Sequence, residues 1–255
     1  MVFWLIIGTA NLVVGALVGL TGVAGFLLPM LYAGSMGMSV AEGLSLSFAA
    51  FVVSGLLGAR NYYKAGNMNL PFGLRLSVGS LFGAIAGVKL HLIIPEAQGK
   101  MILYLVVLLS GISILLRKEG GNAGKEEKKS YLISEHLTAT LLLGFLTGAI
   151  CALSGAGGPV LVMPLLVVLG ISIRTAVGVA LLNSIFIGVP ACIGYMTQCS
   201  MTGLFPVMAV ALITHGIGVS FGSIHAVRIN PTILKKGIAV FSILISIWKL
   251  SQIFY

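Results

Sequence analysis

The stretch "ALSGAGGPVLVMP", from Ala152 to Pro164, places three glycines and two prolines... inside a long apolar segment. Glycine and proline both weaken a helix. Lipid cannot supply hydrogen-bond partners for the backbone groups that a broken helix leaves free. If this segment lies in a membrane, we therefore expect the break to be covered by protein or to face a polar cavity.

The composition of the chain is that of an integral membrane protein. Of the 255 residues, 58% are hydrophobic and 8% are charged, and the mean hydropathy is +1.11. A soluble domain carries about 25% charged residues. Apolar stretches long enough to cross a bilayer recur along the whole chain, which excludes a single anchor on a soluble domain. The first residues lack a basic region and continue into the glycine pattern, so we expect them to belong to the fold.

The charged residues and cysteines narrow the function further. The net charge is +9, which in a membrane protein indicates basic cytoplasmic loops and not nucleic-acid binding. All six acidic residues are glutamate, which removes the aspartate-based metal, phosphotransfer and protease motifs. The three cysteines lie in or near apolar segments and are interpreted as packing residues. We expect no cofactor, no metal and no nucleic-acid partner.

The glycine-rich break occurs twice. "GALVGLTGVAG" (Gly15–Gly25) aligns with "GAICALSGAGG" (Gly148–Gly158) at a shift of 133 residues. We place a two-residue insertion directly after these loops, so that Pro29 matches Pro164 and later matches follow at a shift of 135. Internal repeats with interrupted helices at matching positions are typical of secondary transporters, and the interruptions indicate the substrate site.

A polar run near the middle of the chain separates the two copies. It spans Arg117–Ser130 and has the composition of a solvated linker. We therefore predict a first transmembrane repeat over 1–116, a polar cytoplasmic linker over 117–131 and a second transmembrane repeat over 132–255.

The distribution of basic residues indicates how the repeats are oriented. If the first apolar segment of each half crosses the membrane once, the basic residues divide 9 to 6 between the two sides. If that segment enters, breaks at the glycines and returns, they divide 12 to 3. Only the second division is a clear positive-inside bias. We predict an all-α polytopic protein of two inverted repeats, each with a glycine-broken first segment and three further transmembrane helices. Both termini then lie outside the cell.

The paired pattern G-x-x-x-G/A-L-T/S-G-x-x-G, followed by P-x-L and A-x-G, resembles the sulfite exporter TauE/SafE family of bacterial and archaeal membrane proteins. The resemblance covers nearly the whole chain. It implies a multi-pass transporter of the inner, cytoplasmic membrane that moves small sulfur-containing anions such as sulfite or sulfonates.

The two breaks are the candidate substrate site. Each exposes backbone N–H groups at the start of a following half-helix, where the partial positive charge binds anions. Asn183 is polar at mid-segment and is expected to face the bundle interior. The alternative is that the glycines only allow close helix packing. The candidate substrate-binding residues are Thr21, Gly22, Gly25, Ser154, Gly155, Gly157, Gly158 and Asn183.

Other polar and aromatic residues have structural interpretations. "SVAE" (Ser39–Glu42) matches a capping box, which we favour over a buried coupling acid. His215 could relay protons, but its counterpart in the first half is Ser80, which favours a role in the core. Tyr62, Tyr63 and Tyr195 are interpreted as aromatic residues of the membrane interface. The glycine pairs Gly83/Gly87, Gly144/Gly148 and Gly218/Gly222 are interpreted as packing contacts.

These features favour a secondary transporter that works by alternating access. An anion channel and an accessory subunit of another membrane complex stay as alternatives. An intramembrane enzyme is disfavoured, because the sequence has no GxSxG or HExxH motif. The expected partners are the small anion and the lipid bilayer, while a coupling proton and a homodimer stay open.

Overall fold

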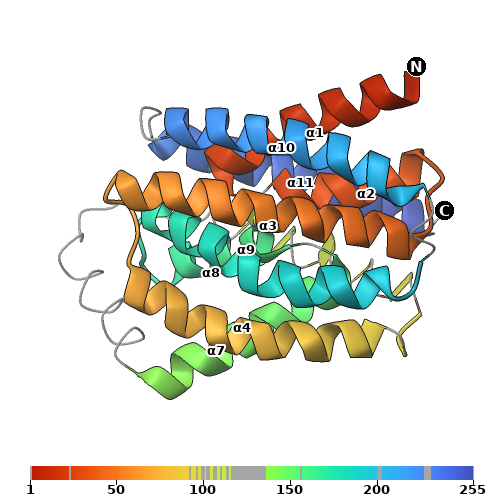
Figure 1. Cartoon of the computed structure of the whole chain (residues 1–255). Coiled ribbons are helices and arrows are strands. Elements are labelled where there is room, and N and C mark those ends of the chain that lie inside the picture. Colours follow the sequence, from red (N-terminus) through yellow and green to blue (C-terminus); the bar gives the residue numbers. More distant parts are fainter. Residues whose placement is uncertain are drawn as a thin grey trace.

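The computed structural model consists of helices joined by short connections (Figure 1). The structure describes residues 2–22, 24–91, 136–155, 157–199, 203–226 and 231–254, with scattered residues between 93 and 115. The predicted linker over 117–131 lies outside the described residues. Among the described residues, six helices are long and apolar enough to cross a membrane, and they are α1, α3, α4, α7, α9 and α10 in the element list that follows.

Both halves of the chain contain the same order of elements: a long helix, a break, a short helix and two long helices. The first half contains α1 (Val2–Thr21), the 3-10 helix η1 (Ala24–Phe26), α2 (Leu27–Ser35), α3 (Val40–Lys64) and α4 (Leu70–His91). The second half contains α7 (Leu137–Ser154), α8 (Gly158–Val168), α9 (Ile173–Met196), α10 (Leu204–Ala226) and α11 (Pro231–Phe254). The predicted break in the first apolar segment is therefore present in both halves.

The start of α3 is fixed by a capping box. The Ser39 hydroxyl accepts a hydrogen bond from the Glu42 backbone N–H, and the Glu42 carboxylate accepts one from the Ser39 N–H at 2.9 Å. The start of α9 is capped in the same way by the Ser172 hydroxyl, which accepts from the Thr175 N–H. The predicted capping role of Ser39 and Glu42 is confirmed.

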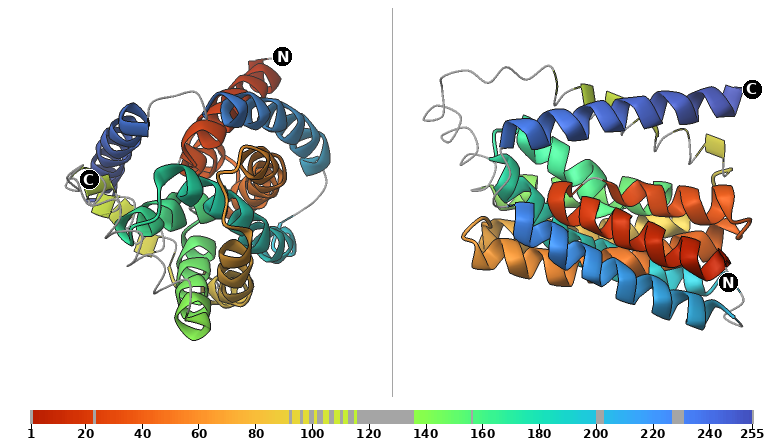
Figure 2. Two further views of the ribbon diagram at one scale, coloured as in Figure 1. Left: turned by 90° about the vertical axis from the view of Figure 1, so that its left-hand side faces the viewer. Right: turned by 90° about the horizontal axis from the view of Figure 1, so that it is seen from above.

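Helices α3 and α9 form the centre of the bundle and cross each other in opposite directions (Figure 2). A Cβ placed on Gly55 of α3 would lie 2.7 Å from the Leu181 carbonyl oxygen. A Cβ placed on Gly188 of α9 would lie 3.0 Å from the Phe48 carbonyl oxygen. Residue numbers thus rise along α3 as they fall along α9, so the two helices are antiparallel.

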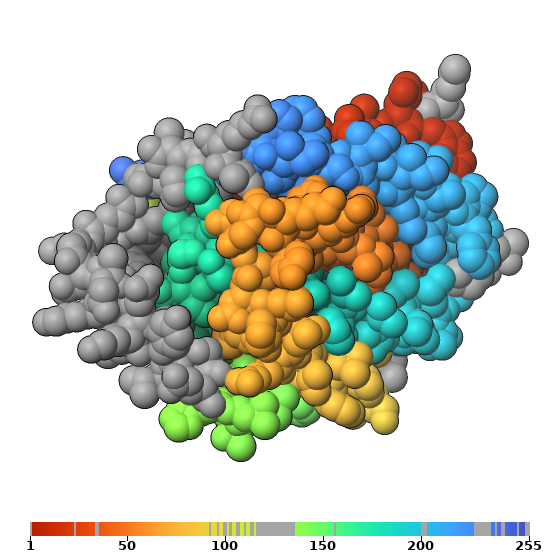
Figure 3. Space-filling model, turned by 60° about the vertical axis from the view of Figure 1, so that its left-hand side comes forward, coloured from red at the N-terminus to blue at the C-terminus, as the bar shows by residue number. Residues whose placement is uncertain are grey.

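Two further pairs, α1 with α10 and α4 with α7, lie on either side of the central pair (Figure 2). A Cβ on Gly218 would overlap the Leu12 carbonyl oxygen, and one on Gly83 would overlap that of Phe145. The glycines therefore let the helix backbones touch, and their interpretation as packing residues is confirmed. Side chains from both halves consequently intermix on one face of the molecule (Figure 3).

The first segment of the chain returns along the bundle after its break. Gly15 of α1 contacts His215 of α10, and Gly19 contacts Val219, so α1 and α10 run in the same direction. His215 also pairs with Ser54 of α3 and Ser223 with Asn61, so α3 runs in that direction too. Because α1 and α3 are parallel, the residues between them must travel back along the bundle.

The two-residue insertion lies elsewhere than the sequence alignment placed it. Gly55 and Gly188 make matching contacts and differ by 133 residues, and α2 and α8 end at matching positions, Ser35 and Val168. The shift becomes 135 only for α4 and α10, where Gly83 and Gly218 match. Our placement directly after the glycine loops is therefore wrong. The extra residues lie in the connection between α9 and α10, because an insertion in a loop leaves every buried helix face in register.

Candidate functional site

The second break is built from glycines in conformations that other residues rarely adopt. Helix α7 ends at Ser154, and Gly155 follows with φ +76° and ψ +10°. Gly157 has φ +71° and ψ +154° and is the N-cap of α8, with Pro159 in the first turn. A Cβ strains such backbone geometry. Proline at this position costs little, because the first N–H groups of a helix have no intrahelical partner.

The first break is more compact. Helix α1 ends at Thr21, Gly22 has φ +70°, and one turn of 3-10 helix over Ala24–Phe26 leads directly into α2. The N-cap of α2 is Phe26, which lies in the right-handed helical region. The second break therefore has a clearer new helix start than the first.

Two tyrosines satisfy carbonyl groups that the breaks leave free. The Tyr62 hydroxyl donates to the Gly19 carbonyl at 3.3 Å, and the Tyr195 hydroxyl donates to the Ala152 carbonyl at 2.8 Å. Both tyrosines are buried, whereas Tyr63 is exposed. Their interpretation as interface aromatics is wrong, because the last carbonyls of a broken helix need partners that lipid cannot supply.

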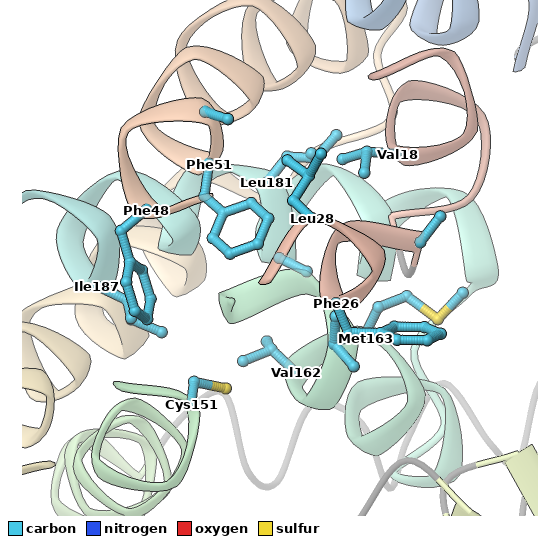
Figure 4. Packing of buried hydrophobic residues seen from close by; sticks show 14 of the residues in the cluster. Val18, Phe26, Leu28, Phe48, Phe51, Cys151, Val162, Met163, Leu181 and Ile187 are labelled. Carbon is cyan, nitrogen blue, oxygen red and sulfur yellow. The ribbon is translucent and has the colours of Figure 1, made fainter. Parts of the chain in front are cut away.

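Both breaks meet at the ring of Phe51, which projects from α3 into the centre of the bundle (Figure 4). A Cβ on Gly25 would lie 2.5 Å from Cε1 of this ring, and a Cβ on Gly157 would lie 2.6 Å from Cε2. The two breaks thus contact opposite edges of one aromatic side chain. Gly158 lies against α9, where its Cβ would be 3.1 Å from the Ser184 Cα.

A buried amide without hydrogen bonds lies beside this meeting point. Asn183 is fully buried, and neither its Nδ2 nor its Oδ1 has a hydrogen-bond partner. It shares a face of α9 with Ile187, one turn further along, whose Cδ1 would lie 3.2 Å from a Cβ on Gly158. The amide therefore lies on the side of α9 that contacts the start of α8. An unsatisfied buried amide calls for an explanation, because leaving it unpaired costs about 1–3 kcal/mol.

The structure brings four of the eight candidate residues together. Gly25, Gly157, Gly158 and Asn183 all lie around Phe51 and the adjacent part of α9. The start of α8 has no side-chain cap, so its backbone N–H groups point into the same region. The groups named here carry no formal charge.

The other four candidates lie further from this centre. Gly22 contacts Val177 near the start of α9, and Gly155 contacts Leu44 near the start of α3. Because α3 and α9 are antiparallel, these two positions lie toward opposite ends of the bundle. The Thr21 hydroxyl donates to the Leu17 carbonyl and the Ser154 hydroxyl to the Ile150 carbonyl, each at 2.6 Å.

Sequence reasoning missed Phe51 and gave Ser184 no role in the centre. The Ser184 hydroxyl donates to the Phe51 carbonyl at 3.0 Å, and the two positions differ by 133 residues. Residues related by the repeat contact each other only where the two halves meet. An alignment that kept the shift of 133 through α3 and α9 would have shown this pair.

Six apolar helices and two broken helices that meet at one buried ring define a multi-pass membrane protein of the transporter type. The model of the family "Sulfite exporter TauE/SafE" matches residues 6–248, and the chain belongs to this family. Its members are membrane transporters and not enzymes.

Two curated relatives are similar over most of their length. The "Probable membrane transporter protein YdhB" of Bacillus subtilis (strain 168) is 28% identical over 191 residues, which cover 72% of this chain and 75% of the relative. A "Probable membrane transporter protein" of Haemophilus influenzae is 26% identical over 256 residues, which cover 91% and 92%. No solved structure matches the chain with significance.

Proposed function

We propose that this chain is a secondary transporter that moves a small sulfur-containing anion, such as sulfite or a sulfonate, across the cytoplasmic membrane by alternating access. The observation that carries the proposal is the meeting of both breaks at Phe51, beside the unpaired amide of Asn183. The name of the family supports the class of substrate.

The chemistry of the site suits an anion that must be released again. The N–H groups at the start of α8 carry partial positive charge, and the Asn183 amide adds a hydrogen-bond donor. Gly157 and Gly158 lack a Cβ, so an anion can approach the backbone closely. Neutral donors bind more weakly than an arginine or lysine, which favours turnover. Thr21, Gly22, Ser154 and Gly155 then contact the anion as it enters or leaves.

Inverted repeats supply the alternation. Helices α3 and α9 are equivalent under the shift of 133 residues and run in opposite directions, which supports an inverted relation between the halves. The two breaks leave the centre toward opposite ends of the bundle. Movement of one half against the other then opens the centre to one side at a time.

An anion channel is the second candidate function, and the Phe51 contacts argue against it. A continuous pore through both breaks would have to pass a ring that fits against Gly25 on one edge and Gly157 on the other. Transport through such a site requires a conformational change, which is a property of a transporter.

Flux in proteoliposomes tests the proposal. Purified protein would be screened with sulfite, sulfate, thiosulfate and small sulfonates, with empty liposomes as the control. We expect uptake that saturates with concentration, together with exchange of internal for external anion. Flux that rises linearly without saturation would support a channel, and no flux of any of these anions would refute the proposal.

A further inference from the structure

A buried histidine and serine form a polar pair close to the central ring. Nε2 of His215 on α10 lies 2.6 Å from the Ser54 hydroxyl on α3, and both residues are fully buried. Ser54 follows Phe51 by three residues on α3, so the pair lies about one helical turn from the ring. An ionisable residue at this depth in a membrane protein indicates a function.

The surroundings of His215 contain no fixed counter-charge among the described residues. Helix α10 packs on α1 and α3, and α1 has no ionisable side chain. The charged residues of α3 lie near its ends: Glu42 in the cap, and Arg60 and Lys64 exposed in the last turns. Tyr62 is occupied by the Gly19 carbonyl. The protonated imidazole would therefore need its balancing charge from elsewhere.

A second polar pair lies next to the first. The Tyr32 hydroxyl of α2 donates to Oδ1 of Asn11 on α1 at 2.9 Å, and both side chains are buried. Gly15, one turn after Asn11, contacts the His215 backbone. Polar groups from α1, α2, α3 and α10 thus meet in an otherwise apolar part of the bundle.

This arrangement occurs in one half only among the described residues. The equivalent of His215 in α4 is Ser80, whose hydroxyl donates to the Gly144 carbonyl at 2.9 Å. Ser80 cannot take up a proton at physiological pH. The asymmetry indicates a role that one site per chain fulfils, in contrast to the paired tyrosines, which serve both breaks.

We propose that His215 binds one proton that is transported together with each anion, and that Ser54 orients the imidazole. The inference rests on the proposed function. The proton joins a ring nitrogen on one side of the membrane and leaves it on the other, and no other bond changes. A nearby anion favours the protonated ring and the protonated ring favours the anion, because each removes the cost of burying the other's charge alone. A monoanion and a proton then cross as a neutral pair.

The variant His215→Gln tests the proposal in proteoliposomes, with sulfite or the anion that the flux screen identifies. His225→Gln is the matched control, because His225 is exposed on the same helix. We expect His215→Gln to lose accumulation driven by an imposed pH gradient at least about tenfold, while exchange without a gradient continues. His225→Gln should behave as the unmodified protein. Gradient-driven accumulation by His215→Gln at the unmodified level would overturn the proposal.

The variant Ser54→Ala gives a second, independent readout. The Ser54 hydroxyl accepts a hydrogen bond from the protonated ring, and such charge-assisted bonds are the stronger ones. Its loss should move the pH of half-maximal gradient-driven uptake to a lower value. If His215→Gln does not yield monodisperse protein, this profile decides, and an unchanged midpoint overturns the proposal.

The same measurements separate the two proposals. Saturable anion flux in the unmodified protein that ignores the pH gradient refutes the proton site and leaves the transporter intact. An absence of saturable flux refutes the proposed function, and the proton site with it.

Discussion

The amide of Asn183 has opposite effects on folding and on the proposed binding. Its two polar atoms are buried without partners, so they destabilise the empty protein. An anion that accepts from Nδ2 would offset part of this cost. A functional residue of this kind lowers stability for the sake of binding.

The variant Asn183→Leu should therefore be more stable and bind more weakly. Leucine has a similar volume and no polar atom to satisfy, so we expect the free energy of unfolding to rise by about 1–3 kcal/mol. Affinity for the transported anion should fall at least about tenfold. Thermal unfolding of detergent-purified protein and a binding titration measure the two effects. Higher stability with unchanged affinity would show that Asn183 has no contact with the substrate.

The hydroxyl groups at the two breaks should matter less than the amide. Thr21 and Ser154 both donate to carbonyl groups of their own helices. We expect Ser154→Ala and Thr21→Val to change anion affinity by less than about 1 kcal/mol. The same titration, with Asn183→Leu as the sensitive reference, checks this. A loss from Ser154→Ala as large as that from Asn183→Leu would contradict the assignment.

At the residue scale, the sequence predicted the chemistry better than the positions. Gly157 and Asn183 were found because glycine loops and polar residues stand out in apolar segments. Phe51 was not found, because phenylalanine is ordinary in a membrane helix and its role depends on contacts with two distant glycines. The burial of Tyr62 and Tyr195 was missed for the same reason, since the carbonyls that bind them are freed only by the breaks.

At the scale of the elements, each broken helix depends on a tyrosine from the neighbouring long helix. Removing the hydroxyl leaves a carbonyl buried without a partner. We expect Tyr195→Phe to lower the free energy of unfolding by about 1–3 kcal/mol, and Tyr62→Phe by a similar or smaller amount because its hydrogen bond is longer.

Thermal unfolding in detergent measures this effect, and Tyr63→Phe is the control because Tyr63 is exposed. Equal stability of all three variants would show that the carbonyls at the breaks are satisfied in another way.

The elements themselves follow from the sequence to a large extent. The capping box and the glycine pairs predicted a helix start and three close packing contacts, because both patterns act over a few neighbouring residues. The site of the insertion did not follow, because glycine and leucine are so common here that a chance match of Pro29 with Pro164 looked like a register. Contacts between α3 and α9 remove that ambiguity.

At the scale of the whole molecule, the proposed topology places the start of α1 and the connection after α9 on the same, outer side. The end of α3 then faces the cytoplasm. This arrangement depends on the 12-to-3 division of basic residues and on the parallel course of α1, α3 and α10.

Labelling of single cysteines in intact cells tests this topology. On a background without Cys151, Cys192 and Cys199, we expect an impermeant thiol reagent to label cysteine introduced at Val2 or Gln198. Cysteine introduced at Lys64 should react only after permeabilisation. All three native residues are exposed at the surface. Labelling of the Lys64 position from outside, together with protection of the other two, would reverse the orientation.

The contact of one ring with both breaks has a consequence for leakage. While Phe51 lies between Gly25 and Gly157, neither half can widen its break without losing a packing surface that the other half also uses. Water and small ions therefore meet the same barrier from either side of the membrane. A cell that keeps such a protein in its membrane retains its ion gradients between transport cycles, because one side chain contributed by the first half seals both entrances.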